Sequence, residues 1–394
     1  MDTMAVRSSA QKVLSFLLVA AEPVTRPEVA LACQLSRPTV FSAMKQLEDL
    51  QLVSDVGQRS GVPGRSASLY ELRADAALVA GIDIGGSNLR VALADGRGRL
   101  LAETRQATSA VGGPGVIRQV VDLVNALGKG TDSAGARLTV AGVSVPGVVA
   151  ADSSTVHYAW NIGQPEPYDF RTPLVAGLRA PVVLDNNVNL AALGEQWQGS
   201  AQHLRTFAVI AVGAGVGAGI VHEGQLLRGA HGGAGEVAFL PLNPHYRRPG
   251  AASPDEAGGL MLLHQAQARP GWHQGAPTSV EELFARAADG EHPAMELVEE
   301  ESRRIAAIAA SICAIVDPEA VILTGGVGAN PALVARAGEL INELAPFPPA
   351  VIRSALGERA SLVGALAVAV RSAQADLISN AGDRSHTPVS TSAP

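Results

Sequence analysis

The chain has 394 residues, which is enough for two or three domains, and with 47% hydrophobic and 17% charged residues each domain can bury a core. The net charge of −7 is uneven, because residues 1–80 carry eight basic and eight acidic residues while the remainder carries 22 basic against 29 acidic. This distribution excludes a generally basic nucleic-acid-binding protein but permits a local basic face on the amino-terminal segment.

Further features argue against membrane, secreted and disulfide-bonded classes. The most apolar stretch, residues 207–221, is interrupted by four glycines, which favours a hairpin over a membrane span of about 20 residues. Residues 1–11 lack the basic and apolar regions of a signal peptide. Cys33 and Cys313 stand far apart in predicted helices. We therefore expect a cytoplasmic protein with no disulfide and no membrane partner.

Residues 1–74 have the pattern of a helix-turn-helix. Apolar spacing predicts a helix over residues 11–20. Thr25, with Glu28 three residues later, forms a capping box at the start of a second helix. Ser36 caps a third helix, whose outward face carries donors suited to phosphates and base edges in the major groove. These predicted DNA contacts are Arg37, Thr39, Ser42, Lys45 and Gln46.

Two predicted strands, residues 52–53 and 68–72, follow with a glycine-rich connection. In that connection Arg65 follows Gly64, so its side chain can enter a minor groove as the wing of a winged helix does. The alternative is a small helical protein-interaction module with a solvated loop. The agreement of helix spacing, caps and wing favours the DNA-binding reading.

Three glycine turns organise the rest of the chain. Residues 78–95 predict a strand, a glycine turn and a second strand, and residues 207–222 repeat this plan. A third turn, residues 324–328, follows a predicted strand and precedes a helix. Such turns expose backbone N–H groups, so a pair of them can face phosphates from opposite sides of a cleft.

Together with the head, these motifs resemble the ROK family of repressors, open reading frames and sugar kinases. The resemblance covers roughly residues 10–375. It implies an α/β fold, with a winged helix-turn-helix over residues 1–74 and a two-lobed actin-like, hexokinase-like (ribonuclease H-like) body. The lobes are expected over residues 75–190 and 191–373, and the Ser-, Ala- and Pro-containing residues 374–394 as a disordered tail. The motifs behind the resemblance are Leu35 to Val40, Asp83 to Asn88, Val145-Pro146-Gly147, Asp185 to Glu195 and Arg228 to Glu236.

The catalytic base of the ROK kinases is missing. In their Asn-Asp-Ala-Asn pattern the aspartate accepts a proton from the sugar hydroxyl, whereas the matching residues 186–189 are Asn-Asn-Val-Asn. Asn187 cannot take up that proton. Asp185 is one residue away at a strand end, which should aim its side chain elsewhere. We therefore predict no catalytic residue and no enzyme activity.

The nucleotide and zinc sites of the family are also reduced. Gly213-Ala214-Gly215 lacks the hydroxyl of the family's Gly-Thr-Gly, and the zinc-binding histidine of the family is Phe239 here. A structural zinc site needs about four ligands, and no cysteine lies between positions 33 and 313. We expect no metal and no cofactor. The phosphate loops are predicted to be vestigial, with Asp83, Gly85, Gly86, Ser87, Gly213 and Gly215.

Several sugar-site positions of the family retain polar residues. The predicted ligand-binding residues are Asn186, Asn187, Glu236, Phe239 and Glu256. Structural roles are the alternative for two of them, since Asn186 could brace a strand end and Glu236 could cap a neighbouring backbone. Phe239 could stack on a sugar face, accept a less polar ligand or close the pocket.

The sequence thus predicts a ROK-type transcriptional regulator, a repressor that responds to a sugar or sugar-derived ligand. Its partners would be double-stranded DNA with a palindromic operator and a second copy of the chain, as a homodimer or a dimer of dimers. Two alternatives stay open. One is a bifunctional ATP-dependent sugar kinase, which requires Asp185 to replace the base. The other is an orphan regulator whose body only dimerises.

Overall fold

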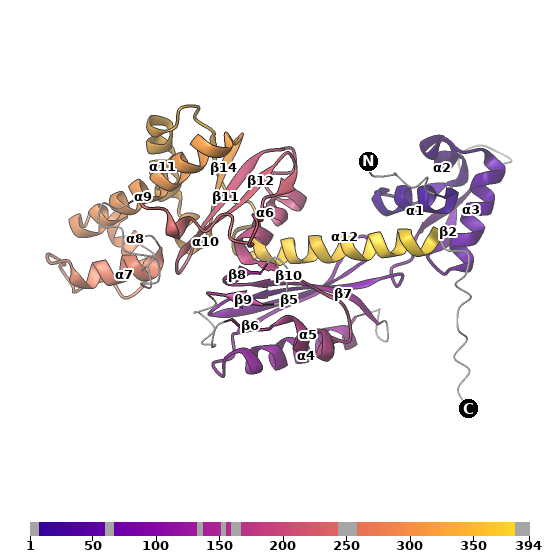
Figure 1. Ribbon diagram of the computed structural model, residues 1–394, viewed down its shortest axis with the longest axis horizontal. Helices are drawn as coiled ribbons and strands as arrows, with labels where there is room; N and C mark the ends of the chain where they lie inside the picture. The colour runs from indigo at the N-terminus through magenta and orange to yellow at the C-terminus, as the bar shows by residue number, and fades with distance from the viewer. Residues whose placement is uncertain are drawn as a thin grey trace.

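The computed structural model describes residues 8–59, 67–131, 137–150, 155–158, 167–242 and 258–382. A head at the amino terminus lies at one end of the long axis, lobe one (residues 78–186) in the middle and lobe two (residues 207–353) at the other end (Figure 1). Helix α12, Ala360–Gly382, runs from the lobes to the head. The first and last described elements therefore meet.

The head contains the predicted helices and hairpin. The capping box is present, because the Thr25 hydroxyl accepts from the N–H of Glu28 and the Glu28 carboxylate accepts from the N–H of Thr25. Ser36 caps the third helix by accepting from the N–H of Thr39. Residues 60–66, with Arg65, lie outside the described residues. The head consists of α1 Ser9–Val19, β1 Val24–Thr25, α2 Arg26–Cys33, α3 Arg37–Asp49, β2 Val53–Arg59 and β3 Ala67–Leu72.

The strands of the head form one antiparallel sheet in the order β1-β3-β2. Its core is made by the apolar stripes that the sequence places on α1 and α3. Leu14, Leu17, Met44 and Leu47 are at most 2% exposed. Each such side chain stabilises the fold by about 1.5–3 kcal/mol relative to exposure.

Lobe one is a five-stranded sheet in the order β10-β7-β4-β5-β6. Helices α4 and α5 cover one face of this sheet and α12 covers the other (Figure 1). A short pair of strands, β8 Val148–Val149 and β9 Val156–His157, follows β7. The main elements are β4 Leu78–Ile84, β5 Asn88–Asp95, β6 Leu100–Ala107, α4 Gly113–Lys129, β7 Leu138–Val145, α5 Arg171–Leu178 and β10 Val182–Asn186.

Lobe two repeats the five-stranded plan, in the order β13-β12-β11-β14-β15. Helix α6, Asn187–Gln198, connects the lobes. The predicted hairpin is β11 Phe207–Val212 and β12 Val216–His222, and the glycines of the third turn form the short helix α10 between β14 and α11. The remaining elements are β13 Gln225–Leu226, η2 Val237–Phe239, α7 Gly259–Ala268, α8 Val280–Ala288, α9 His292–Val316, β14 Ala320–Thr324, α10 Gly325–Gly328, α11 Pro331–Leu344, β15 Ala350–Arg353 and η3 Gly357–Arg359.

Helix α12 corrects two sequence-based boundaries. Its first half, although it follows lobe two in the chain, packs on α6 and on the sheet of lobe one. The predicted disordered tail is wrong for residues 374–382, which are helical, because Leu377, Ile378 and Ala381 enter the apolar core of the head. Residues 383–394 lie outside the described residues.

The same helix explains an apolar signal in the sequence. Within the described ranges, one segment, Gly357–Gly382, is long and apolar enough to span a membrane, and half of its apolar window is buried. Helix α12 has apolar residues on several sides because it packs on α6, on the sheet of lobe one and on the head.

Candidate ligand-binding cleft and DNA-facing surface

A cavity of about 630 Å³ lies between the lobes, and residues of all three glycine turns line it. All the phosphate-loop residues predicted from the sequence are present: Asp83, Gly85, Gly86, Ser87, Gly213 and Gly215. Four predicted ligand-binding residues also line it: Asn186, Asn187, Glu236 and Phe239. Glu256 lies outside the described residues. The fold therefore brings together residues that are up to 156 positions apart in the sequence, from Asp83 to Phe239.

The position of the kinase base carries an amide. Asn187 is half-buried at the start of α6, and its backbone carbonyl accepts from Ser361 at 2.9 Å. Its side-chain amide has no hydrogen-bonding partner within the described chain. An amide here can bind a hydroxyl but cannot act as a general base.

Asp185, the residue before Asn187's neighbour Asn186, does not face the cavity. Its side chain is buried and does not line the cavity. One carboxylate oxygen accepts from the Arg228 guanidinium at 2.8 and 3.0 Å. The other accepts from the Asn189 side-chain amide and the Asn186 N–H, at 3.0 and 2.8 Å. The side chain of Asp185 is therefore engaged by these groups outside the cavity lining.

Asn186 has a structural role, which the sequence analysis gave as the alternative to ligand binding. Its side-chain oxygen accepts from the N–H groups of Val188 and Asn189, which caps α6. Its side-chain amide donates to the Gly147 carbonyl at 2.7 Å. One amide N–H remains for a ligand in the cavity that Asn186 lines.

An aromatic pair borders the same cavity. Phe239 is 41% exposed, and its ring lies 5.8 Å from that of Tyr158, centroid to centroid. The cavity persists beside this pair, so Phe239 does not close the pocket in this structure. Tyr158 was not predicted as a site residue. It has a left-handed backbone (φ 60°), which is uncommon for a side chain of this size and is found more often at binding sites.

Beside the first phosphate loop lies a series of hydrogen-bonded charged side chains that the sequence did not predict. Asp83 is buried and accepts from Ser144 at 2.8 Å and from Arg90 at 3.4 Å. Burial raises the pKa of Asp83, and the Ser144 hydroxyl and the Arg90 guanidinium oppose that rise. Arg90 also donates to Glu358 at 2.5 Å. The one signal in the sequence is a charged residue, Arg90, among the apolar residues 89–94 of β5.

The second phosphate loop uses some of its own backbone groups. The N–H of Gly213 donates to the Gly215 carbonyl at 2.9 Å. The carbonyl of Gly213 accepts from the N–H of Gly259 at 2.7 Å, where α7 begins. Fewer amides are therefore free for a phosphate than the glycine pattern alone suggests.

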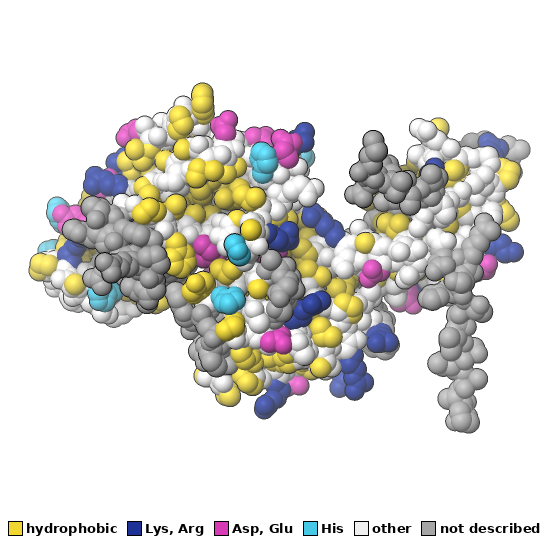
Figure 2. Space-filling model, viewed as in Figure 1, with side chains coloured by type: hydrophobic (Ala, Val, Ile, Leu, Met, Phe, Trp, Pro, Cys, Tyr) yellow, Lys and Arg dark blue, Asp and Glu magenta, His cyan; other side chains and the backbone are white. Residues whose placement is uncertain are grey.

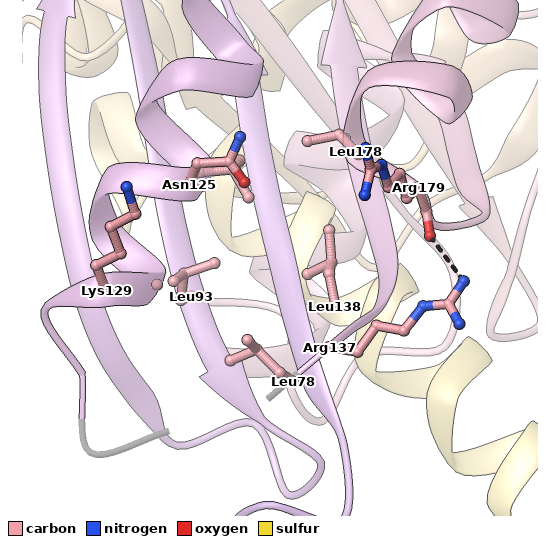
Figure 3. Close-up of a pocket in the computed structure, with 10 residues that line it drawn as sticks. Leu78, Leu93, Asn125, Lys129, Arg137, Leu138, Leu178 and Arg179 are labelled. Carbon is pink, nitrogen blue, oxygen red and sulfur yellow. Dashed lines mark hydrogen bonds between the residues drawn. The ribbon is translucent and has the colours of Figure 1, made fainter. Parts of the chain in front are cut away.

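A second cavity, of about 700 Å³, lies in lobe one at the other end of β4. Apolar side chains, including Leu78 and Leu138, line it together with basic groups (Figure 3). Arg137 donates to the carbonyl of Arg179 at 3.4 Å. No predicted site residue lies there.

In the head, α3 presents part of the predicted DNA-facing surface. Arg37, Ser42 and Lys45 are exposed, and Thr39 is half-buried with its hydroxyl 2.7 Å from that of Ser36. Lys and Arg side chains are visible on the outer end of the head (Figure 2). The prediction for Gln46 needs correction, because its amide donates to the Ala381 carbonyl at the end of α12 instead of facing outward.

The fold and the cleft define a two-lobed, hexokinase-like α/β protein with an added head. The match of residues 79–372 to the ROK family shows that the chain belongs to that family, as the sequence motifs predicted.

Among proteins of known description, both repressors and kinases are similar to this chain. It is 28% identical to a xylose repressor of Caldicellulosiruptor bescii over 222 residues, 56% of this chain and 55% of that protein. It is 29% identical to a glucokinase of Halalkalibacterium halodurans over 170 residues, 43% of this chain and 51% of that protein. The chain thus spans about half the length of these two relatives.

One solved structure is similar to nearly the whole chain, and another is similar to about three quarters of it. A ROK family transcriptional regulator, a homologue of the E. coli MLC protein, covers 95% of this chain and is itself covered to 98%, with a TM-score of 0.75 and 20% identity. A ROK hexokinase from Thermus thermophilus covers 76% of this chain and is covered to 99%, with a TM-score of 0.64 and 28% identity. At 20% identity the first likeness concerns the fold alone.

Proposed function

We propose that this chain is a cytoplasmic DNA-binding transcriptional regulator, a repressor that senses a sugar or sugar-derived ligand and has no kinase activity. The observation that carries the proposal is Asn187 at the base position, with Asp185 paired to Arg228 outside the cavity. Within the described lining the acids are Asp83, Glu236 and Glu358. None of these occupies the position that matches the kinase base.

A magnesium-bound nucleotide does not fit the first phosphate loop as it stands. Asp83 is the acid of that loop, and the Arg90 guanidinium already lies beside it. A divalent cation near Asp83 would meet this positive charge at short range. The proposed function therefore uses no metal and no cofactor.

The head gives a second line of support for the proposed function. We assign it as a winged helix-turn-helix, with Arg37, Ser42 and Lys45 reading the major groove and Arg65 of the wing reaching the minor groove. The relatives described as repressors, including the xylose repressor, agree with this assignment. The proposed active form is a homodimer or a dimer of dimers on a palindromic operator.

Helix α12 offers a physical link between the two functions. Ala360 and Ser361 at its start line the cleft, and Ala381 at its end is buried in the head. A ligand that binds one lobe arrangement better than another shifts the population toward that arrangement. Through α12 such a shift would change the placement of the head, and with it operator affinity.

Selection of genomic DNA fragments by the purified chain, followed by sequencing, tests DNA binding directly. We expect one palindromic sequence whose half-sites lie about one or two helical turns apart. Binding that does not discriminate among sequences would contradict the regulator. A parallel assay of ATP consumption with hexoses and amino sugars is expected to show no turnover, and turnover that Asp185→Ala abolishes would instead establish the kinase.

Ligand sensing has its own test, which separates a sensor from a body that only dimerises. A ligand that binds the native state raises its melting temperature in a concentration-dependent manner. We expect at least one sugar or sugar derivative to do so. Without stabilisation by any of them, the body would be a dimerisation scaffold.

A further inference from the structure

We propose that the ligand sensed in this cleft is an anionic sugar of the sugar phosphate class, whose anionic group binds Arg90 and Arg105 in place of Glu358. This inference rests on the proposed sensing function and names the class of its ligand. It comes from the charged groups that cross the first phosphate loop.

Arg90 is a positive charge fixed within the cleft. Its side chain is 12% exposed, lines the cavity and is anchored by buried Asp83, which is itself held by Ser144. Removing the guanidinium from this place would leave a buried carboxylate without its charged partner, which is unfavourable. A ligand therefore meets Arg90 as a permanent feature of the wall.

Glu358 is the replaceable partner. Its side chain is 61% exposed and belongs to the turn η3, immediately before α12. Arg90 donates to it at 2.5 Å, and Arg105 lies 3.5 Å from the same carboxylate oxygen. Two guanidiniums thus converge on one exposed carboxylate: Arg90 and Glu358 line the cleft, and Arg105, which is 55% exposed, reaches Glu358 from outside that lining. Because the Glu358 carboxylate is largely exposed, solvent already competes for it, and an anion that pairs with the same guanidiniums can displace it at small cost.

The surroundings suit a phosphate ester. Arg105 is oriented by Asn88 of the phosphate loop, whose side-chain oxygen accepts from its Nε at 3.0 Å. The N–H groups of Gly86 and Ser87 line the cavity and donate to no group of the described chain. A phosphate has three oxygens and nearly two negative charges, so it can accept from both guanidiniums and from these amides together.

Other ligand classes explain the arrangement less well. A neutral sugar offers no charge to compete with Glu358 and would leave both arginines paired as they are. A nucleotide with its magnesium ion meets Arg90 beside Asp83. The polar groups that suit sugar hydroxyls, Asn187 and Glu236, line the same cavity. A sugar that carries an anionic group suits both the arginines and the polar groups of the cleft.

Displacement of Glu358 would act on α12. The carboxylate ties the turn before α12 to β5, since Arg90 lies on that strand. When an anion takes over Arg90 and Arg105, this tie is released at the end of the helix nearest the cleft. The other end packs in the head, so the sugar phosphate and the operator would be linked through one element.

Isothermal calorimetry on the full chain tests the ligand class. The probes are D-glucose, N-acetyl-D-glucosamine and D-xylose, a phosphate ester of each, and inorganic phosphate. We expect one ester to bind at least about tenfold more tightly than its neutral parent and than inorganic phosphate. Equal or tighter binding of the neutral sugar, equal binding of inorganic phosphate, or no binding by any ester would overturn the inference.

Variants with opposite expected effects locate the anion. Arg105→Gln should weaken binding of the ester by about tenfold or more, because a charge-assisted hydrogen bond is lost. Glu358→Gln should strengthen it severalfold, because the competing carboxylate is gone. The matched control is Arg359→Gln, since Arg359 pairs with Glu103 and does not line the cavity. It should bind the ester as the unmodified chain does.

These experiments fail separately from the proposed function. If Arg105→Gln and Glu358→Gln bind the ester with unchanged affinity, the anion site is wrong even if the chain binds its operator. Operator binding without ligand is measured on the same variants, and its absence in the unmodified chain would contradict the regulator itself.

Discussion

The charged side chains on helix α3 of the head differ from those in the cleft in whether they form ion pairs. On α3, Arg37 and Lys45 form no ion pair with any residue in the described ranges. In the cleft, Arg90 donates to both Asp83 and Glu358. An unpaired surface cation can meet a phosphate without rearrangement, whereas a paired one must exchange its partner. In the proposed regulator, the head therefore binds DNA without exchanging ion-pair partners, whereas the body exchanges a partner when it binds its ligand.

The largest expected effect concerns the helix that joins the two regions. In Gly364→Ala the new Cβ would lie 1.7 Å from the carbonyl oxygen of Leu190, where α12 crosses α6. Backbone must move to relieve this contact, so we expect a loss of more than about 3 kcal/mol in the free energy of unfolding. Denaturant unfolding followed by circular dichroism measures it.

Gly128→Ala is the control for that variant. Gly128 also lies in a helix, α4, but nothing is within 4 Å of the added Cβ. Alanine is favoured over glycine in helices by up to about 1 kcal/mol, so this variant should be as stable as the parent or slightly more stable. Equal stability of both variants would show that α12 does not pack as closely on α6 as the structure has it.

The second prediction tests the unpaired cations of the head. Arg37→Ala should lower operator affinity by about 10- to 100-fold, since a good base contact contributes roughly 1–3 kcal/mol. Fluorescence anisotropy with the selected operator measures the change. Arg118→Ala, which removes an exposed arginine from α4 in the body, should leave the affinity as it is. An equal loss in both variants would mean that net charge, rather than α3, determines binding.

The head was predictable because its signals are local. The capping box of Thr25 and Glu28, and the Ser36 cap, each depend on residues three positions apart. Hydrophobic periodicity then fixed which faces of the helices are buried. The prediction of a missing base also rests on a local signal, one residue within a short motif, and stays a prediction.

The parts that sequence analysis missed depend on distant contacts. Arg90 and Glu358 are 268 positions apart, and Gln46 and Ala381 are 335 apart. No local pattern pairs such residues. The sequence predicts a disordered tail there because the last residues lose periodicity and are rich in Ser, Thr, Ala and Pro, yet Leu377 packs against the core of the head and Ala381 is buried in it. Tertiary packing overrides composition there.

The third prediction distinguishes two roles of α3, which are contact with the end of α12 and contact with DNA. Gln46→Ala removes the hydrogen bond to the Ala381 carbonyl, which contributes about 1 kcal/mol. We expect faster amide exchange at residues 377–382 and a small change, less than about threefold, in operator affinity. Lys45→Ala, at the adjacent exposed position, should give the reverse pattern. If Gln46→Ala lowers affinity as strongly as Arg37→Ala, then Gln46 reads DNA after all.

The smallest expected effect lies in the capping box, within the head alone. The N–H of Thr25 and the Arg59 guanidinium lower the pKa of Glu28 below its ordinary value of 4.5. Because folding lowers this pKa, the carboxylate stabilises the head above pH 4.5, and the stabilisation is lost as the pH falls through the folded pKa. Glu28→Gln keeps the hydrogen-bond acceptor but not the charge. Since the side chain is 45% exposed and solvent screens it, we expect a cost of at most about 0.5 kcal/mol at neutral pH and a smaller cost at about pH 3. Thermal unfolding at both pH values measures it, and a cost that is the same at both would mean that the charge of Glu28 has no part in the cap.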